Sequence, residues 1–395
     1  MTVSRHFVLA AGGTGGHLIP AFALATELER RGHHVALVTD DRGARIPGKP
    51  DFLPAHVLPA GRLGKNPVTL AKGLRAIWQG RAMALRLFES FQPSCVVGFG
   101  GYPALPALLA AQSAQIPTVI HEQNAVLGRV NRLLARRVNA IATAYRDLDR
   151  LDAKWADKVH LVGNPVRAEV LALRKEPFPP LDDDGLLRVL VTGGSQGASI
   201  LAEVVPDGLA MLPPALCHRL QVTQQCRPED IDAVRARYAA HQIPAELGTY
   251  FEDMATRLAE THLFIGRSGA STIAELTAVG RPGILVPLPI ATDDHQAANA
   301  RELVKAGGAR AIRQSGFTPK ELAKQVQAIA LNPEALANAA HAAWNCGFPD
   351  AVSDLADLVE SFGAAPIMDV IRMKSAPAQA GFATATARSA REDAR

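Results

Sequence analysis

The sequence is poor in aromatic residues and in cysteine. Aromatic residues make up 5% of the 395-residue chain, although 48% of its residues are hydrophobic. The four cysteines show no CxxC spacing, which argues against a structural zinc site or a disulfide framework. The formal net charge of +4 is too small to indicate nucleic-acid binding. No apolar run approaches the roughly 18 residues of a membrane span, and no signal-peptide cleavage site follows Arg5. We therefore expect a soluble α/β protein of the cytoplasm.

Glycine, by contrast, is concentrated in a loop near the start of the chain. Phe7 to Ala11 is typical of a buried strand and Leu18 to Leu28 of an amphipathic helix; GGTGGH lies between them. Such a loop brings backbone N–H groups close to a ligand at a helix start, which favours a phosphate or diphosphate. The GxGxxG fingerprint fails at Leu18, and the nearest Walker A match fails at Pro50. A tight turn without a ligand is the alternative.

Two halves of the chain repeat the same pattern. FVLAAGGTGG recurs as RVLVTGGSQGA at 188–198, and the strand–glycine–helix pattern of 95–111 recurs at 263–280. Strands alternating with helices predict parallel sheets, so we expect two doubly wound domains whose ligands bind at the carboxyl ends of the strands. We place the first domain at 1–163 and the second at 164–347. A last helix follows at 348–363, and the Ala/Ser/Thr-rich tail 364–395 is predicted to be disordered.

A DLD triplet at Asp147 to Asp149 resembles a metal-binding motif. It precedes an arginine and an irregular polar stretch, so we interpret it as a solvated helix face rather than a metal site. We expect no metal and no cofactor.

Seven motifs, in order and at consistent spacing, carry a family resemblance: GGTGGH, GFGGYP, HEQNAVLGRVN, GNPVR, GGSQGA, RSGAST.AEL and DDHQAANA. From about Val3 to Phe362 the chain resembles the bacterial N-acetylglucosaminyltransferases that convert lipid I into lipid II for peptidoglycan. The resemblance implies a GT-B fold, in which two Rossmann-like domains face each other across a cleft. It also implies inverting transfer from UDP-GlcNAc to the C4 hydroxyl of undecaprenyl-diphospho-N-acetylmuramoyl-pentapeptide, without a required metal.

The resemblance assigns the donor mainly to the second domain. Ser195 and Arg167 would meet the diphosphate and the uridine side, Glu275 the ribose hydroxyls and Gln296 the sugar. Phe251 would contact uracil through its backbone. The full set of implied donor contacts is Thr14, Gly15, Gly16, Asn124, Arg167, Ser195, Phe251, Ala270, Ser271, Thr272, Glu275 and Gln296. A helix cap for Ser195, a surface cation for Arg167 and an acid favoured by the helix dipole for Glu275 are the alternatives.

The first domain would take the acceptor, through Gly13, His17, Tyr102 and Asn131. An imidazole with a pKa near ~6.5 can accept the proton of an attacking hydroxyl at neutral pH, so His17 is the candidate catalytic base. Glu122 is the alternative base. A His17 that packs beneath the loop and a structural Glu122 remain open at this point.

A basic stretch from Arg62 to Arg86 contains no acidic residue, and apolar residues interleave at helical spacing. Such a helix is typical of a membrane-surface contact, although the apolar stripe could instead face the domain core. We predict contact with an anionic membrane through Lys72, Arg75, Trp78 and Arg81. With a lipid-linked acceptor, this places the chain peripherally on the cytoplasmic face of the inner membrane, where other cell-wall synthesis proteins are possible partners.

Other enzymes with the same expected fold are the alternatives. Another GT-B lipid glycosyltransferase would share the glycine loops, and a UDP-GlcNAc epimerase would bind the same donor without needing a lipid-facing helix. The failed GxGxxG fingerprint disfavours a dinucleotide-dependent oxidoreductase.

Overall fold

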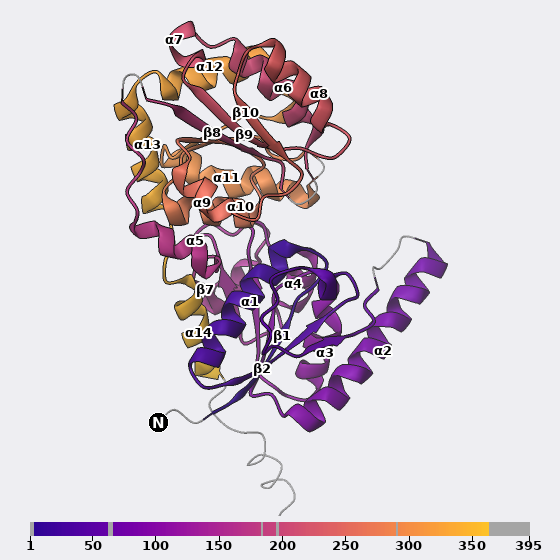
Figure 1. The fold of residues 1–395 in the computed structure, drawn as a ribbon. Coiled ribbons are helices and arrows are strands. Elements are labelled where there is room, and N and C mark those ends of the chain that lie inside the picture. Colours follow the sequence, from indigo (N-terminus) through magenta and orange to yellow (C-terminus); the bar gives the residue numbers. More distant parts are fainter. Residues whose placement is uncertain (1–3, 62–65, 183–184, 195–196, 290, 363–395) are drawn as a thin grey trace, which may run out of the picture.

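Two parallel α/β units stand one above the other in the computed structural model (Figure 1). The structure describes residues 4–61, 66–182, 185–194, 197–289 and 291–362. Ser195 and the tail 364–395 of the sequence analysis lie outside these residues. The predicted pair of doubly wound α/β sheets is confirmed.

The first unit is a seven-stranded parallel sheet with the order β3-β2-β1-β4-β5-β6-β7. Its strands are β1 (His6–Ala10), β2 (His34–Thr39), β3 (Ala55–Val57), β4 (Cys95–Gly98), β5 (Thr118–Glu122), β6 (Ala140–Thr143) and β7 (Val159–Leu161). Its helices are α1 (Gly15–Arg30), α2 (Pro67–Phe91), α3 (Ala104–Ser113) and α4 (Arg129–Leu134). The strand order reverses between β1 and β4, and a crevice at such a point is where open α/β sheets bind ligands.

The second unit is a six-stranded parallel sheet with the order β10-β9-β8-β11-β12-β13. Its strands are β8 (Leu187–Thr192), β9 (Leu220–Gln225), β10 (Ala245–Gly248), β11 (Leu263–Gly266), β12 (Gly283–Leu285) and β13 (Ala309–Ala311). The helices from the crossover onward are α5 (Ala168–Ala172), α6 (Ser199–Ala210), α7 (Pro214–Cys217), α8 (Ile231–Ala240), α9 (Met254–Glu260), α10 (Ala270–Val279), α11 (His295–Lys305), α12 (Pro319–Ala330) and α13 (Pro333–Asn345). The reversal here lies between β8 and β11.

Buried apolar side chains cover both faces of the first sheet. Phe7 and Leu9 of β1 belong to one hydrophobic cluster, whereas Val8 and Ala10 belong to another. Because parallel strands with helices on both faces have no solvated side, they are continuously apolar, as the short runs in this sequence are.

The last helix, α14 (Ala351–Phe362), returns to the first unit and lies beside α1 (Figure 1). Leu355 and Val359 are fully buried in the same cluster as Phe7. Arg31, just after α1, donates to Glu360 at 2.8 Å. The chain therefore crosses between the units twice, once before α5 and once before α14.

Two details differ from the sequence analysis. The prediction that Asp147 to Asp149 lies on a helix is wrong: these residues form a loop, and Asp149 makes an isolated bridge with Val126. This bridge provides hydrogen-bond partners for backbone groups next to the second unit. The periodicity of the local sequence cannot predict such a contact. The short strands β3, β10 and β13 at or near the sheet edges were not predicted.

Within the described residues, no helix is both long enough and apolar enough to cross a membrane.

Candidate active site

The glycine loop after β1 leads directly into α1. Thr14 is the N-cap residue with extended backbone, and its side chain does not cap the helix. The first turn of α1 contains no acidic residue. The backbone N–H of Gly13 donates to Asp40 Oδ1 at 3.1 Å, which holds the loop against the end of β2. The start of α1, with Gly15 and Gly16, thus offers N–H groups and the positive end of the helix dipole to a ligand.

The half-buried His17 ring packs against the loop that follows β4. Gly100 and Gly101 there have φ values of +87° and +75°, a region that favours glycine. A Cβ added to Gly100 would lie 3.4 Å from His17 Cε1, and one added to Gly101 would lie 3.5 Å from His17 Cδ2. The two glycines are therefore direct neighbours of the imidazole, and their backbone conformation, not a lack of space beside the ring, is what favours glycine. Tyr102 follows directly and packs against the core of the first unit.

A chain of hydrogen bonds runs from His17 into the interior of the first unit. His17 Nδ1 lies 3.0 Å from Gln123 Oε1, and Gln123 Nε2 lies 3.0 Å from His121 Nδ1. His121 Nε2 lies 2.9 Å from the carbonyl oxygen of Gly163. Burial lowers the pKa of His121 to about 4, so this ring is neutral at physiological pH.

Glu122, at the end of β5, is buried and fully engaged. Its Oε1 accepts from the backbone N–H and the side-chain amide of Asn124, at 3.1 and 3.2 Å. Its Oε2 accepts from the Gly128 N–H and from Asn131 Nδ2, both at 2.8 Å. Four donors match the four lone-pair positions of a carboxylate. The loop from 123 to 131 is thereby organised around this side chain.

In the second unit, α10 begins after β11, where the strand order of the second sheet reverses. Gly269 is the N-cap residue, and no side chain caps the helix. Ser271 Oγ is buried and has no hydrogen-bond partner among the described residues. Ala270 and Thr272 lie in the same half-buried first turn. An uncapped helix start with a spare hydroxyl is suited to a phosphate group.

Arg167 and Glu275 form an ion pair below this helix start. The Arg167 Nη2 and Nε atoms donate to Glu275 Oε1 at 3.0 and 3.2 Å. The Glu275 side chain is 17% exposed. Burial raises its pKa, and the Arg167 charge opposes that shift. The pair joins the crossover segment to α10, and both hydrogen bonds from Arg167 go to the same carboxylate oxygen, Oε1.

The two other predicted donor residues lie on different elements. Gln296, on α11, accepts from the Leu288 N–H at 3.0 Å through Oε1, and its backbone carbonyl accepts from Ser268 Oγ at 2.8 Å. Phe251, between β10 and α9, is buried, and the Arg257 guanidinium carbon lies 4.4 Å from its ring centroid.

Asn299 of α11 joins the two halves of the site. Its Oδ1 accepts from the Ala125 N–H at 2.8 Å, and its Nδ2 donates to Asn124 Oδ1 at 3.1 Å and to the Ser268 carbonyl at 3.2 Å. Asn124, which follows Gln123, is thus connected to Ser268, which precedes Gly269. This buried amide therefore ties the segment that follows Gln123 to the loop that precedes α10.

Ion pairs flank this connection. Arg132 of α4 donates to Asp293 at 2.8 Å, and Arg301 of α11 donates to Asp149 at 2.7 Å. Asp293 has a φ of +57°, unusual for a residue other than glycine.

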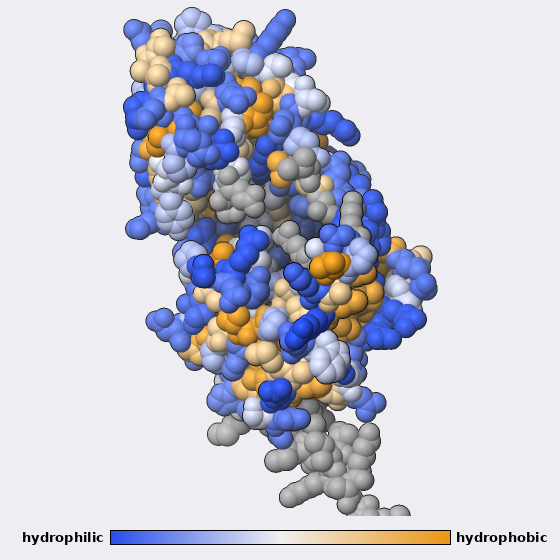
Figure 2. Space-filling model, turned by 90° about the vertical axis from the view of Figure 1, so that its right-hand side faces the viewer, coloured by the Kyte–Doolittle hydropathy of each residue, from blue (hydrophilic) through white to orange (hydrophobic). Residues whose placement is uncertain are grey.

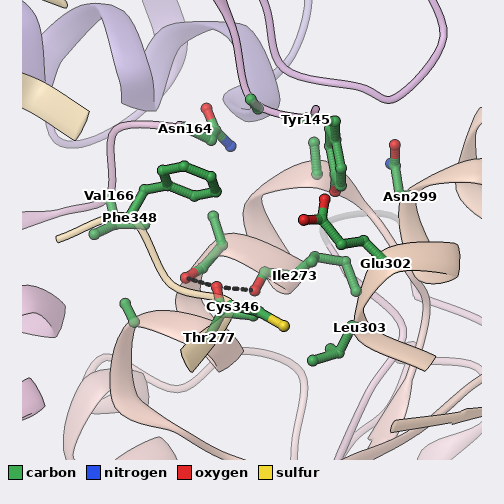
Figure 3. A pocket seen from close by; sticks show the side chains of 14 residues that line it. Tyr145, Asn164, Val166, Ile273, Thr277, Asn299, Glu302, Leu303, Cys346 and Phe348 are labelled. Atoms are coloured by element: carbon green, nitrogen blue, oxygen red, sulfur yellow. Dashed lines mark hydrogen bonds between the residues drawn. The ribbon is translucent and has the colours of Figure 1, made fainter. Parts of the chain in front are cut away.

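A cavity of about 40 Å³ lies behind the site between the two units (Figure 3). Asn164 from the crossover, Tyr145 from the first unit and Glu302 from α11 line it. Both polar atoms of the Asn164 side chain are buried without a partner among the described residues. Because a water needs roughly 10–15 Å³ and polar partners, this space is suited to ordered water rather than to a substrate.

The predicted membrane contacts lie away from this site, on α2 at the outer edge of the first unit (Figure 1). Lys72, Arg75 and Trp78 are exposed, and Arg81 is half-buried. Leu74 is also exposed, whereas Ile77 is buried. The apolar stripe is therefore divided between the core and the surface, and Figure 2 shows this face as mixed hydrophobic and hydrophilic patches.

The structure thus brings Arg167 to Glu275 and places Asn124 and Asn131 against Glu122, and it adds several residues that the sequence analysis did not single out. The additions are Gln123, His121, Gly100, Gly101 and Asn299. The HEQN motif contained two of them, but only the strand order β1-β4-β5 places them beside His17. Within the described part of the chain, no cluster of three His, Cys, Asp or Glu residues could hold a metal ion.

Comparison with known proteins gives matches over nearly the whole chain. The glycosyltransferase family 28 N-terminal domain matches residues 7–143, and the family 28 C-terminal domain matches residues 188–357. A UDP-N-acetylglucosamine–N-acetylmuramyl-(pentapeptide) pyrophosphoryl-undecaprenol N-acetylglucosamine transferase of Novosphingobium aromaticivorans is 85% identical, covering 95% of this chain and 96% of that protein. The protein of the same name from Erythrobacter litoralis is 77% identical, covering 94% and 93%. The crystal structure of Acinetobacter baumannii MurG is 30% identical, with a TM-score of 0.75 over 90% of this chain and 99% of that chain.

Proposed function

The chain belongs to the family of UDP-N-acetylglucosamine–N-acetylmuramyl-(pentapeptide) pyrophosphoryl-undecaprenol N-acetylglucosamine transferases, and we propose that it catalyses the reaction for which these relatives are named. It transfers N-acetylglucosamine from UDP-GlcNAc to the C4 hydroxyl of the lipid I sugar and produces lipid II and UDP. The observation that carries this proposal is Asn299, because it joins the segment that follows Gln123, the partner of the candidate base, to the residue before the open start of α10.

On the donor side, the start of α10 and the Arg167–Glu275 pair would hold UDP-GlcNAc. The uncapped N–H groups of α10 and the spare Ser271 hydroxyl would receive the diphosphate, whose charge increases as UDP leaves. Glu275, with one oxygen held by Arg167, has its other oxygen for the ribose hydroxyls. Gln296 would meet the sugar, and the Phe251 backbone the uracil. Thr14, Gly15, Gly16 and Asn124 would close over the donor from the first unit.

On the acceptor side, His17 is the better candidate for the base. Its Nδ1 is engaged by Gln123, which directs the other ring nitrogen away from the interior. Glu122 accepts four hydrogen bonds and has no free position for a substrate proton. We assign Glu122 to the organisation of the loop that carries Asn124 and Asn131. His17 accepts the proton of the C4 hydroxyl as that oxygen attacks the anomeric carbon and the bond to UDP breaks. Gly13, Tyr102 and Asn131 would position the acceptor.

The two alternative enzyme classes share the fold but differ in product. Another GT-B lipid glycosyltransferase would release UDP without forming lipid II, and an epimerase would convert UDP-GlcNAc without any acceptor. The relatives at 85% and 77% identity support the lipid II reaction over both.

The exposed part of α2 would contact the membrane that holds the acceptor. Lys72, Arg75 and Trp78 combine cations with an exposed aromatic ring, and each cation near anionic lipid contributes roughly 1 kcal/mol. Arg81 would contribute from the edge of the same face. This binding is peripheral, on the cytoplasmic face of the inner membrane, where other cell-wall synthesis proteins would be neighbours.

The test of the reaction uses the purified chain with labelled UDP-GlcNAc and a lipid I analogue, with and without EDTA. Labelled lipid II, formed equally with EDTA, is the expected result. Release of free UDP without lipid II, or formation of an epimerised nucleotide sugar, would overturn the proposal.

A further inference from the structure

We propose that Gln123 is a positioning residue that holds His17 in the Nδ1–H tautomer, so that Nε2 carries the lone pair that a base requires. The inference rests on the proposed function for its role in catalysis. The hydrogen-bond chain itself can be tested without any turnover.

The direction of the chain is fixed at its inner end by the carbonyl oxygen of Gly163. A carbonyl oxygen only accepts, so His121 Nε2, at 2.9 Å from it, carries a proton and donates. His121 is buried and neutral, and its Nδ1 must then be an acceptor. Because Nδ1 accepts, the Gln123 atom that lies 3.0 Å from it must be the amide nitrogen.

A second carbonyl fixes the Gln123 amide independently. Gln123 Nε2 also lies 3.1 Å from the backbone oxygen of His121, which again can only accept. Exchanging the amide oxygen and nitrogen would place two acceptors against each other at this point. The orientation of the amide therefore does not depend on His121 alone, and Oε1 must face His17.

The chain leaves His17 one arrangement. Oε1 of an amide only accepts, so His17 Nδ1, at 3.0 Å, carries the proton. A neutral imidazole with a proton on Nδ1 has its lone pair on Nε2. Free histidine favours the opposite tautomer, in which Nε2 is protonated and cannot act as a base. Gln123 therefore corrects an intrinsic preference that opposes the reaction.

The loop after β4 lies beside the rest of the ring. Gly100 is next to the Cε1 side of His17 and Gly101 is next to the Cδ2 side. The ring thus lies between the glycine loop after β4 and the Gln123 amide of the segment after β5. The orientation and the tautomer of the His17 ring are thus set by segments at the ends of neighbouring strands of one sheet.

The direct test is ¹⁵N NMR of the full chain with labelled histidine, because the two neutral tautomers give different ring-nitrogen shifts. The chain has 12 histidines, and the spectrum of His17→Gln identifies the His17 signals. We expect wild-type His17 to be in the Nδ1–H form at a pH where it is neutral. We expect Gln123→Leu to move it toward the Nε2–H form.

Kinetics test the consequence for the reaction. Gln123→Leu should lower kcat by roughly 10- to 1,000-fold, less than the ~10⁴-fold loss when a protease loses the carboxylate that orients its histidine. The KM for UDP-GlcNAc should change by less than about twofold, because the lost interaction acts on the base and not on the bound donor. Gln123→Glu should not restore kcat, since its second oxygen would face the His121 carbonyl oxygen and His121 Nδ1, the two acceptors that the amide nitrogen now satisfies.

Gln112→Leu in α3 is the matched control. Both polar atoms of Gln112 are buried without a partner among the described residues, so this variant removes a buried amide elsewhere in the same unit. It should leave the His17 signals and kcat unchanged.

The NMR result separates the inference from the proposed function. A wild-type His17 in the Nε2–H form would overturn the inference, even if Gln123→Leu failed to fold. An unchanged His17 spectrum in a folded Gln123→Leu protein would overturn it as well. Absence of lipid II with the wild-type protein would instead overturn the proposed function and leave the tautomer result standing.

Discussion

The two halves of the site use the same parallel-sheet framework in opposite ways. In the first unit, the polar groups at the strand ends bond to one another: Glu122 accepts four hydrogen bonds, and His17 ends a chain that begins at Gly163. In the second unit, Ser271 Oγ at the start of α10 has no partner among the described residues, and α10, like α1 of the first unit, has no side-chain cap.

This difference matches the different tasks of the two halves. A base must be held in one tautomer and one orientation before the substrate arrives, so its partners belong to the protein. A diphosphate brings its own acceptors, so the groups that bind it remain open until it arrives. Substitutions in the first unit should therefore affect turnover and folding, whereas those in the second should affect donor affinity.

The largest effect is expected at His17. His17→Gln should lower kcat by roughly 10²- to 10⁴-fold, the usual contribution of a general base, because the alternative base Glu122 has all of its acceptor positions occupied. Steady-state transfer to a lipid I analogue measures this. A kcat within tenfold of wild type would show that another group accepts the proton.

Glu122 should matter more for folding than for chemistry. Glu122→Ala leaves the Gly128 and Asn124 N–H groups and the Asn131 amide without their acceptor, and we expect a loss of roughly 3–5 kcal/mol in the free energy of unfolding. Urea denaturation measures it, with Glu275→Ala as the control for loss of a carboxylate from the other unit. Equal destabilisation by both substitutions would remove the contrast between the two halves.

Glu275 should control donor affinity. Glu275→Gln should raise the KM and Kd for UDP-GlcNAc by roughly 10- to 100-fold, since a charged hydrogen-bond acceptor contributes about 1.5–3 kcal/mol, while kcat at saturation stays within a few fold. Calorimetry and steady-state kinetics measure the two quantities. A fall in kcat at unchanged Kd would place Glu275 in the chemical step instead.

The pH dependence of donor binding follows from the same residue. Burial raises the pKa of Glu275 above its ordinary value of 4.5, so this carboxylate becomes protonated at a higher pH than an exposed one. In the proposed donor site, the ionised form is the one that would accept from the ribose hydroxyls. The Kd for UDP-GlcNAc should therefore increase as the pH falls through this raised pKa, and Glu275→Gln should remove that increase.

The smallest effect is expected at the ion pair between the units. Arg132→Ala should lower the free energy of unfolding by less than about 1 kcal/mol, since Arg132 and Asp293 are both partly exposed and such pairs contribute little. Thermal unfolding measures it, with Arg301→Ala as the comparison on the other flank. A much larger loss would indicate that this contact, and not Asn299, holds the halves together.

The sequence predicted the architecture because β1, β4, β8 and β11 are short apolar runs that are each followed by glycines and a helical pattern. It missed β3, β10 and β13, which are only three or four residues long and carry exposed or polar residues. Asp149 was wrongly predicted to lie on a helix, because its position depends on a bond to Arg301, which is 152 residues away in the sequence. For the same reason His17 could be selected as a base from its position, whereas its partner Gln123 lies 106 residues away and depends on strand order.

The most direct measurement is the equilibrium affinity of UDP-GlcNAc for His17→Gln and for Glu275→Gln, without acceptor and beside the transfer rates of the same two proteins. The account predicts that His17→Gln binds the donor as wild type does but transfers it slowly, and that Glu275→Gln binds weakly but transfers at near wild-type kcat when saturated. Loss of donor binding in His17→Gln, together with unchanged donor binding in Glu275→Gln, would contradict the division of labour between the two halves.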